Sequence, residues 1–358
     1  MLALCNSNIP TARKAREVIC SGAIDRPYGG SILLVVDQGR LVKSEYRRHW
    51  WAIKSKAGAG IFVFSLQDLV VKSVSGLYPV HEVIVIRSVA AIPFLFVLVW
   101  QAGGLRAARS PRAGALLLRS VMMLLAYTTY FLAFPVMKLA DINALYATVP
   151  LFVTALAGPF LGEKITAQRW AAVAVGFVGV LIMVRPGATV FELASLLPIF
   201  SALAYATAQI LARRIGLAYS AAVMSFYQNF IYLGGAAILA AVVTGWGGGY
   251  SGHPSIEFLV RQWVMPDLQD LILIALCGPI AAIGLTRLGQ AYRLTEVNFV
   301  TSFEYTALIW GTLWGYVVWH EVPGISSVIG AVLIVLAGLS LLVRLNPQQA
   351  AVPEFLER

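Results

Sequence analysis

The chain has 358 residues, of which 59% are hydrophobic and 12% are charged. An average soluble domain carries about 25% charged and about 45–50% apolar residues, so this composition excludes an ordinary soluble globular protein and favours a surface that mostly faces lipid. The formal net charge is +10, but the Lys and Arg residues occupy short gaps between apolar runs. That pattern is typical of membrane proteins and argues against a nucleic-acid-binding domain.

Residues 1–56 contain no apolar run long enough to span a bilayer and no secretory signal pattern. We interpret them as a flexible cytoplasmic tail; the alternative is a start codon placed too far upstream. A second cytoplasmic tail is predicted over 346–358.

Ten apolar segments lie between the tails, each close to the roughly 20 residues that a membrane-spanning helix needs. The gaps between them carry helix-breaking pairs such as Tyr78-Pro79 and Pro323-Gly324. The long gap at about 244–267 is expected to hold a Gly-rich turn and a short surface helix. The predicted segments are about 58–76, 82–101, 115–135, 142–161, 167–185, 192–212, 221–243, 268–287, 296–318 and 324–343.

Alternate gaps are rich in Lys and Arg, and the positive-inside rule assigns those gaps to the cytoplasm. The other gaps hold little positive charge beyond Lys138, Arg185 and Arg261. Both termini are then predicted to be cytoplasmic, which requires an even number of helices. For a bacterial protein this predicts a multi-pass location in the inner membrane.

The two halves of the chain show a weak internal repeat, predicted to form units over 57–187 and 188–345. Each unit has five predicted segments, so the second copy enters the membrane from the opposite side. Such inverted repeats are typical of secondary transporters. The matched positions are Asp141-Ile-Asn143 with Glu296-Val-Asn298, and Gly179 through Arg185 with Gly338 through Arg344.

These features resemble the drug/metabolite transporter superfamily, specifically its ten-helix EamA-type members. The resemblance covers about 58–345 and is carried by Ala140–Glu163, Gly176–Gly187 and Phe303–Glu321. It implies an all-α membrane protein in which the first, third, fourth, sixth, eighth and ninth helices line a central cavity. The resemblance favours Tyr130, Tyr146, Tyr205, Tyr305 and Trp310 as cavity residues, and Asn143 is a further candidate. The structural alternative for each is an interfacial or interhelical position.

Three charged residues fall inside the first two predicted helices. Asp68 lies near the middle of the first, Lys72 is one turn further, in position to pair with it, and Arg87 lies in the second. Charge in the hydrocarbon layer costs at least about 2.5–3.5 kcal/mol per group on insertion scales. The functional interpretation is a substrate or proton site at Asp68 that Lys72 and Arg87 tune; the structural alternative is an ion-pair cluster that joins the two helices.

Glu304 lies within the ninth predicted helix with no basic residue near it in the sequence. A carboxylate in this setting is predicted to exchange protons or to bind a cationic group. The structural alternative is a protonated glutamate that is bonded to a neighbouring hydroxyl or indole group.

Other residues of the predicted helices have conformational or structural roles. Pro150 and Pro279 are candidate gating hinges, with a static kink as the alternative. Glu163 and Glu321 end predicted helices and are expected to bond to the start of the following helix or to a basic loop neighbour.

No phosphate-binding loop, zinc-protease motif or nucleophile elbow occurs in the sequence, so no enzymatic activity is expected. The three cysteines and four histidines have no metal-ligand or disulfide spacing, and we predict neither a metal site nor a cofactor. The sequence favours transport of a small polar metabolite by alternating access, with protons as candidate coupling ions. An integral-membrane enzyme or a helical subunit of a membrane complex is the alternative. The oligomeric state, monomer or homodimer, stays open, as does the substrate: an amino acid, a nucleoside-like compound or a vitamin.

Overall fold

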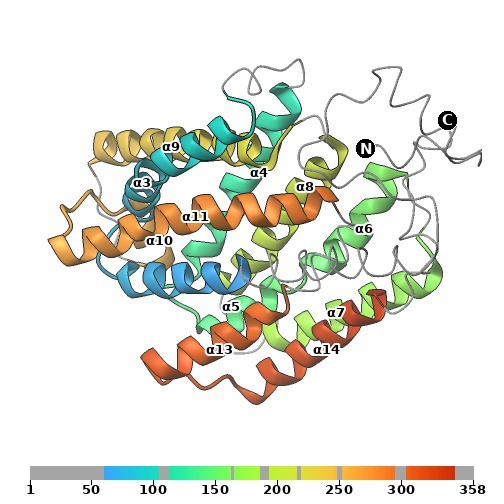
Figure 1. Cartoon of the computed structure of the whole chain (residues 1–358). Helices are drawn as coiled ribbons and strands as arrows, with labels where there is room; N and C mark the ends of the chain where they lie inside the picture. The colour runs from blue at the N-terminus through green and yellow to red at the C-terminus, as the bar shows by residue number, and fades with distance from the viewer. Residues whose placement is uncertain are drawn as a thin grey trace, which may run out of the picture. The chain divides into compact units, whose positions relative to one another are not determined.

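The computed structural model describes residues 60–104, 113–162, 165–185, 193–215, 219–247, 252–294 and 304–342. The predicted tails over 1–56 and 346–358 lie outside these ranges, as do the repeat markers Glu163, Glu296, Asn298 and Arg344. Within the described ranges every regular element is a helix, and seven helical stretches are long and apolar enough to cross a membrane (Figure 1). The protein is therefore an all-helical, multi-pass membrane protein, whereas the count of ten spans and the inverted repeat stay predictions.

In the first half of the described chain, helices occupy the predicted apolar segments. A helix covers residues 60–74. It is followed by α3 (Val80–Gln101), α4 (Ala113–Leu132), α5 (Leu139–Tyr146), α6 (Val149–Leu161) and α7 (Ala167–Val184).

The second half begins with a short 3₁₀ turn, η3 (Leu193–Ser195). The helices after it are α8 (Leu196–Ile215), α9 (Ala221–Trp246), α10 (Pro254–Val260), α11 (Leu268–Leu294), α13 (Thr306–Trp319) and α14 (Ile325–Leu342). The short helix expected in the gap at 244–267 is α10.

Local sequence signals set several of the helix ends. Thr166 and Ser220 cap α7 and α9, because each side-chain oxygen accepts a hydrogen bond from the backbone N–H three residues on. Gly162 ends α6 in the left-handed region at φ 72°, where glycine has no steric penalty.

The fourth predicted segment is interrupted between α5 and α6. Ala147 and Thr148 form a turn, and Pro150 lies in the first turn of α6, where its missing N–H costs no helical hydrogen bond. Pro279 instead lies inside α11, which continues on both sides of it. The structure thus places a break beside Pro150 and none at Pro279, while a hinge motion at either residue stays a prediction.

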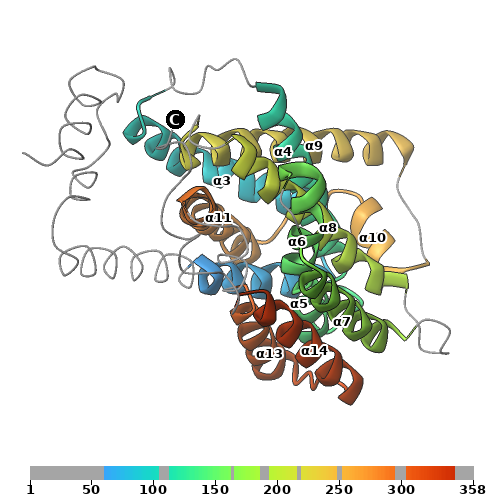
Figure 2. The same ribbon diagram turned by 90° about the vertical axis from the view of Figure 1, so that its right-hand side faces the viewer.

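Small residues let the helices approach closely, as is common when lipid supplies no hydrophobic drive between them. A Cβ atom on Gly179 of α7 would lie 2.8 Å from the Gly330 carbonyl oxygen of α14. A Cβ atom on Gly278 of α11 would lie 2.7 Å from the Arg87 carbonyl oxygen of α3. The pairs α7 with α14 and α11 with α3 are among the most extensive helix contacts, and both views show α7 beside α14 (Figure 1, Figure 2).

Candidate functional site: a tyrosine-lined cavity

A cavity lies among the helix over residues 60–74, α4, α5, α8, α11 and the start of α13. It holds about 690 Å³ of space free of atoms, counting the part that is open to the surroundings. Apolar and aromatic side chains make most of the wall, with a few polar groups among them, as is usual for sites that bind small molecules. The predicted site residues that the structure brings together on this wall are Asp68, Tyr130, Asn143, Tyr146, Tyr205 and Glu304.

Asp68, Tyr130 and Asn143 form a row of oxygen atoms on one side of the cavity. The Tyr130 hydroxyl lies 3.0 Å from Asp68 Oδ2 and 3.1 Å from Asn143 Oδ1. Asn143 Nδ2 donates to the Leu139 carbonyl oxygen at 3.0 Å, which fixes the amide so that its oxygen faces Tyr130. The phenol supplies one hydrogen to two acceptors, so a second hydrogen on Asp68 completes both bonds.

Glu304 lies on another part of the wall and is 8% exposed. The Tyr205 hydroxyl donates a hydrogen bond to Glu304 Oε1 at 2.9 Å. The Tyr146 ring lies between the two carboxylate sites, with ring centroids 5.0 Å from Tyr130 and 5.6 Å from Tyr205. Three neighbouring tyrosine rings therefore connect Asp68 with Glu304.

Glu304 lies directly before the described part of the ninth predicted helix, and residues 295–303 lie outside the described ranges. It forms a turn with Tyr305, and α13 begins at Thr306.

Tyr305 and Trp310, which were predicted to line the cavity, lie elsewhere. Tyr305 packs in an apolar cluster with residues such as Leu145 and Ile334, and its hydroxyl fills the space that a side chain on Gly338 would need. Trp310 packs edge-on against Phe62, with ring centroids 4.7 Å apart.

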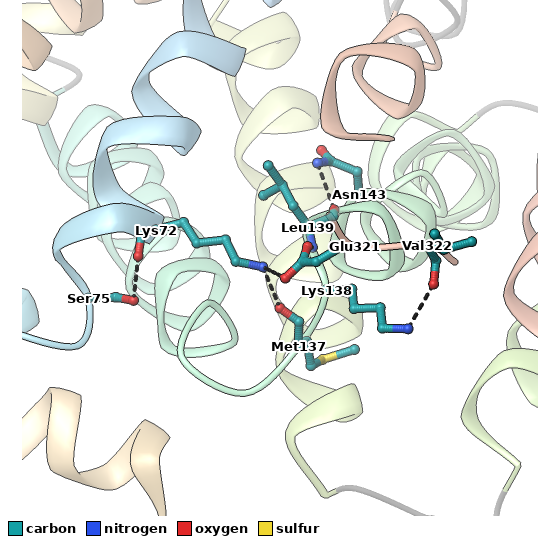
Figure 3. A network of polar contacts seen from close by, with 8 residues as sticks. All are labelled: Lys72, Ser75, Met137, Lys138, Leu139, Asn143, Glu321 and Val322. Carbon is teal, nitrogen blue, oxygen red and sulfur yellow. Dashed lines mark hydrogen bonds and ion pairs between the residues drawn. The ribbon is translucent and has the colours of Figure 1, made fainter. Parts of the chain in front are cut away.

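Lys72 pairs with Glu321 and not with Asp68, so the predicted pairing is wrong. Lys72 Nζ lies 2.6 Å from Glu321 Oε1 and donates to the Met137 carbonyl oxygen at 3.0 Å (Figure 3). The other carboxylate oxygen of Glu321 accepts from the Leu139 backbone N–H at 2.9 Å. The physical reason is reach: the loop between α13 and α14 brings an acid to the end of the Lys72 side chain, where both charges gain a partner.

Glu321 also departs from its predicted partners. It bonds to the start of α5 and to Lys72, and not to the start of α14, the helix that follows it. Lys138 beside it donates to the Val322 carbonyl oxygen at 2.7 Å (Figure 3). We refer to Lys72, Met137, Lys138, Leu139, Glu321 and Val322 as the Lys72 network.

Arg87 lies outside the cavity lining, although it was predicted to tune Asp68. Its guanidinium donates to Gln67 Oε1 at 3.3 Å and lies 5.8 Å and 5.3 Å from the ring centroids of Tyr127 and Tyr232. Tyr127 itself lines the cavity. Arg87 is therefore separated from the solute space by an aromatic ring, in a position to act on the cavity through its charge alone.

Arg119 of α4 is a buried charge that sequence reasoning missed. It is 4% exposed and donates to Gln228 Oε1 at 3.1 Å. Gln228 in turn donates to the Tyr232 hydroxyl at 3.0 Å. The signal was present, because Arg119 falls inside a predicted span in the same way as Asp68, and a charged residue in a span is unusual.

Neither arginine forms an ion pair with a carboxylate among the residues that the structure describes. In those same ranges no group of three or more His, Cys, Asp and Glu side chains could hold a metal ion. The polar groups of the cavity wall are thus two carboxylates, one amide, and the hydroxyls of tyrosine and serine residues.

Comparison with known protein families finds a match over part of the chain. Residues 57–185 match the EamA-like transporter family. The chain is therefore similar to this family over that part of its length. A protein of known crystal structure is 17% identical in sequence to this chain, and the alignment covers 82% of this chain and 98% of that protein. The TM-score of 0.56 shows that the two share a fold.

Several named transporters are similar to this chain. It is 27% identical over 284 residues to a pseudopaline exporter from Pseudomonas aeruginosa, covering 78% of this chain and 92% of that protein. It is 27% identical over 223 residues to an S-adenosylmethionine uptake transporter from Rickettsia bellii, covering 62% of this chain and 70% of that protein. It is 29% identical over 255 residues to a riboflavin transporter from Vibrio cholerae, covering 70% of this chain and 78% of that protein. These relatives support membrane transport of small metabolites and are consistent with a protein that is not an enzyme.

Proposed function

We propose that this EamA-type protein is a secondary active transporter of the bacterial inner membrane that moves a small polar metabolite by alternating access. The observation that carries the proposal is the cavity itself. Two carboxylates and an amide lie on the wall of a cavity inside a protein whose outer helices suit lipid. Buried acidic groups of this kind are expensive in a membrane, and a solute pathway gives them a role.

The pattern of helix contacts supports two related units. If the sequence halves are matched in order, α3 corresponds to α9, α4 to α11, and α7 to α14. The contact of α4 with α9 then has a counterpart in that of α11 with α3, and α7 with α14 and α3 with α9 are contacts between counterparts. A contact map that is preserved when the halves are exchanged is what a repeat predicts.

Helix breaks at matching positions support the same arrangement. The repeat aligns Asp141 with Glu296, which places Pro150 opposite Tyr305. The break between α5 and α6 lies beside Pro150, and the turn before α13 includes Tyr305. Interrupted helices near the middle of the membrane are typical of solute sites in secondary transporters.

In this proposal the Lys72 network closes the outer end of the cavity. Lys72 follows the cavity residue Asp68 by one helical turn, and Leu139 precedes the cavity residue Asn143 by one turn. The network therefore joins the ends of segments that line the cavity. The positive-inside rule assigns the gaps around Lys138 and Val322 to the outer face, with both termini inside.

Proton coupling at Asp68 is part of the proposal. The row of Asp68, Tyr130 and Asn143 oxygens is complete when Asp68 carries a hydrogen. Release of that proton on one side of the membrane would couple the conformational change to a proton gradient. Glu304 is the second candidate, because it also lies on the wall and accepts from a phenol.

Reconstitution of the full chain into proteoliposomes tests the proposal. Vesicles with an imposed pH gradient are offered radiolabelled S-adenosylmethionine, riboflavin and nucleoside-like compounds, and net uptake is compared with counterflow exchange. We expect Asp68→Asn to lose gradient-driven accumulation by tenfold or more while it retains exchange, because exchange needs no net proton movement.

The control is Glu257→Gln on α10, whose carboxylate lies outside the cavity at 3.9 Å from Arg261. If Asp68→Asn and Glu304→Gln both keep full pH-driven uptake, proton coupling is wrong. Flux that rises without saturation and shows no counterflow would contradict a carrier. Catalytic turnover of the solute would favour the alternative of a membrane enzyme.

A further inference from the structure

We propose that a groove between α13 and α14 binds a phospholipid whose headgroup carries an ammonium group, with one acyl chain against the apolar walls and the headgroup at Asp141 and Lys138. The inference goes beyond the proposed function, because it concerns the surface towards the bilayer and names neither a solute nor a coupling ion. It follows from the shape of the groove, the chemistry of its walls and the two opposite charges at one end.

The groove exists because α13 and α14 pack mainly on different neighbours. The main partner of α13 is α5, and that of α14 is α7. Residues 320–324, which join the two helices, are not helical. The space between the helices forms a groove over α5 that holds about 770 Å³ free of atoms, counting the part that is open to the surroundings.

The walls of the groove suit an acyl chain. Val328, Val332 and Leu336 of α14 line it at intervals of four residues, and Leu308 of α13 lies opposite them. These three α14 side chains are 47%, 50% and 58% exposed, which is typical of an apolar surface that another apolar group covers. They extend over about 12 Å of helix, close to the roughly 15 Å thickness of one leaflet of the hydrocarbon core.

Polar groups gather at the end of the groove near the loop. Asp141 lines this end, and its Oδ1 atom is buried and accepts no hydrogen bond within the described part of the chain. Ser327 lies near the same carboxyl group. Lys138, three residues before Asp141, is exposed, and its Nζ donates to the carbonyl oxygen of Val322, next to the lining residue Pro323 (Figure 3). An anion and a cation therefore lie about one helical turn apart.

This pair of charges complements a zwitterionic headgroup. A lipid phosphate gains an ionic partner at Lys138, and an ammonium group gains one at Asp141, where its N–H donors reach the Oδ1 atom. Phosphatidylglycerol has no cation for Asp141, and the trimethylammonium group of phosphatidylcholine has no N–H to donate. Phosphatidylethanolamine has both a phosphate and N–H donors, so we expect the groove to select it.

Native mass spectrometry of the full chain tests the inference. The purified protein, stripped of lipid in detergent, is titrated with phosphatidylethanolamine, phosphatidylglycerol and phosphatidylcholine that have identical acyl chains. The fraction of protein with one bound lipid gives the three affinities. We expect phosphatidylethanolamine to bind at least about fivefold more tightly than either of the others. Asp141→Asn should reduce this preference to about twofold or less, because the amide has no charge for the ammonium group.

A second variant tests the groove without altering its charges. Val332→Trp should fill the space for the acyl chain and abolish the preference. The matched control is Val317→Trp on α13, because Val317 is also about half exposed but does not line the groove, and it should leave the preference unchanged. Circular dichroism and gel filtration check that each variant is folded.

Several outcomes would overturn the inference. They are equal affinity for the three lipids, no bound lipid at all, or an unchanged preference in folded Val332→Trp. The same spectra report the oligomeric state of the protein. A dimer that Val332→Trp dissociates would assign the groove to a second copy of the chain instead of a lipid.

Discussion

The Lys72 network gives the sharpest test of how the cavity opens. The side chains of Lys72 and Glu321 are 7% and 18% exposed, and the pair connects the helix over residues 60–74 with the loop between α13 and α14. Glu321→Gln keeps the shape of the side chain and one oxygen for the Leu139 N–H, but it removes the negative charge that faces Lys72. The ammonium then keeps the Met137 carbonyl oxygen as a partner and has no anion.

The expected magnitude follows from the burial of the pair. Removal of one partner from a buried ion pair costs about 3–5 kcal/mol, and the partial exposure of Glu321 favours the lower end. If the open conformation returns both groups to water, this cost falls on the closed conformation alone. A shift of about 3 kcal/mol changes the ratio of open to closed molecules by about a hundredfold.

Cysteine labelling measures that ratio. Ala147 lines the cavity, so Ala147→Cys in a background with the native cysteines replaced by serine reports access from the outer face to a membrane-impermeant thiol reagent. We expect Glu321→Gln to raise the labelling rate by one to two orders of magnitude. Lys72→Gln combined with Glu321→Gln should be more stable than Glu321→Gln alone, because the double variant has no uncompensated charge.

A labelling rate within twofold of the parent in a folded Glu321→Gln protein would refute the reasoning. The same conclusion would follow if Glu257→Gln, which alters only an ion pair on α10, raised the rate as much.

Two further predictions concern stability. Gly179→Ala should lower the stability of the protein by about 1–3 kcal/mol, since the added Cβ would lie 2.8 Å from the Gly330 carbonyl oxygen. The matched control is Gly114→Ala, which has open space around its Cβ and should be neutral or slightly stabilising. Equal melting temperatures for both would contradict the close packing of α7 on α14. Ser220→Ala should lower the stability of the protein by about 1 kcal/mol, because it removes the cap of α9, and Ser220→Asp should recover most of that loss. Thermal melts in detergent compare the two variants with the parent protein. An unchanged melting temperature in Ser220→Ala would show that the cap is not needed.

Much of the cavity could be predicted because its residues break the rules for lipid-facing helices. Asp68 and Glu304 are acidic residues in apolar segments, and Tyr130, Tyr146 and Tyr205 are polar aromatic residues within such segments. Side chains of this kind are disfavoured in lipid, so they face the protein interior or a solute pathway. The structure brings these five onto one wall.

The errors have equally physical causes. Helical spacing places Lys72 beside Asp68, but it carries no information about an acid 249 positions away that reaches the same lysine. Tyr305 was assigned to the cavity because the resemblance has the ninth helix line it, but a helix presents only one face to a cavity, and Tyr305 packs in an apolar cluster instead. Long-range partners and helix breaks depend on tertiary packing, which a single sequence does not encode in its periodicity.

The buried charges of the Lys72 network and those of the cavity wall have different kinds of partner. Lys72 and Glu321 neutralise each other, so their network needs nothing from outside the protein. On the wall, Asp68 accepts a hydrogen bond from the Tyr130 hydroxyl, and a phenol donates a hydrogen bond without cancelling a charge. Under the proposed function a proton completes the Asp68 group, and its release on one side of the membrane couples proton movement to the conformational change.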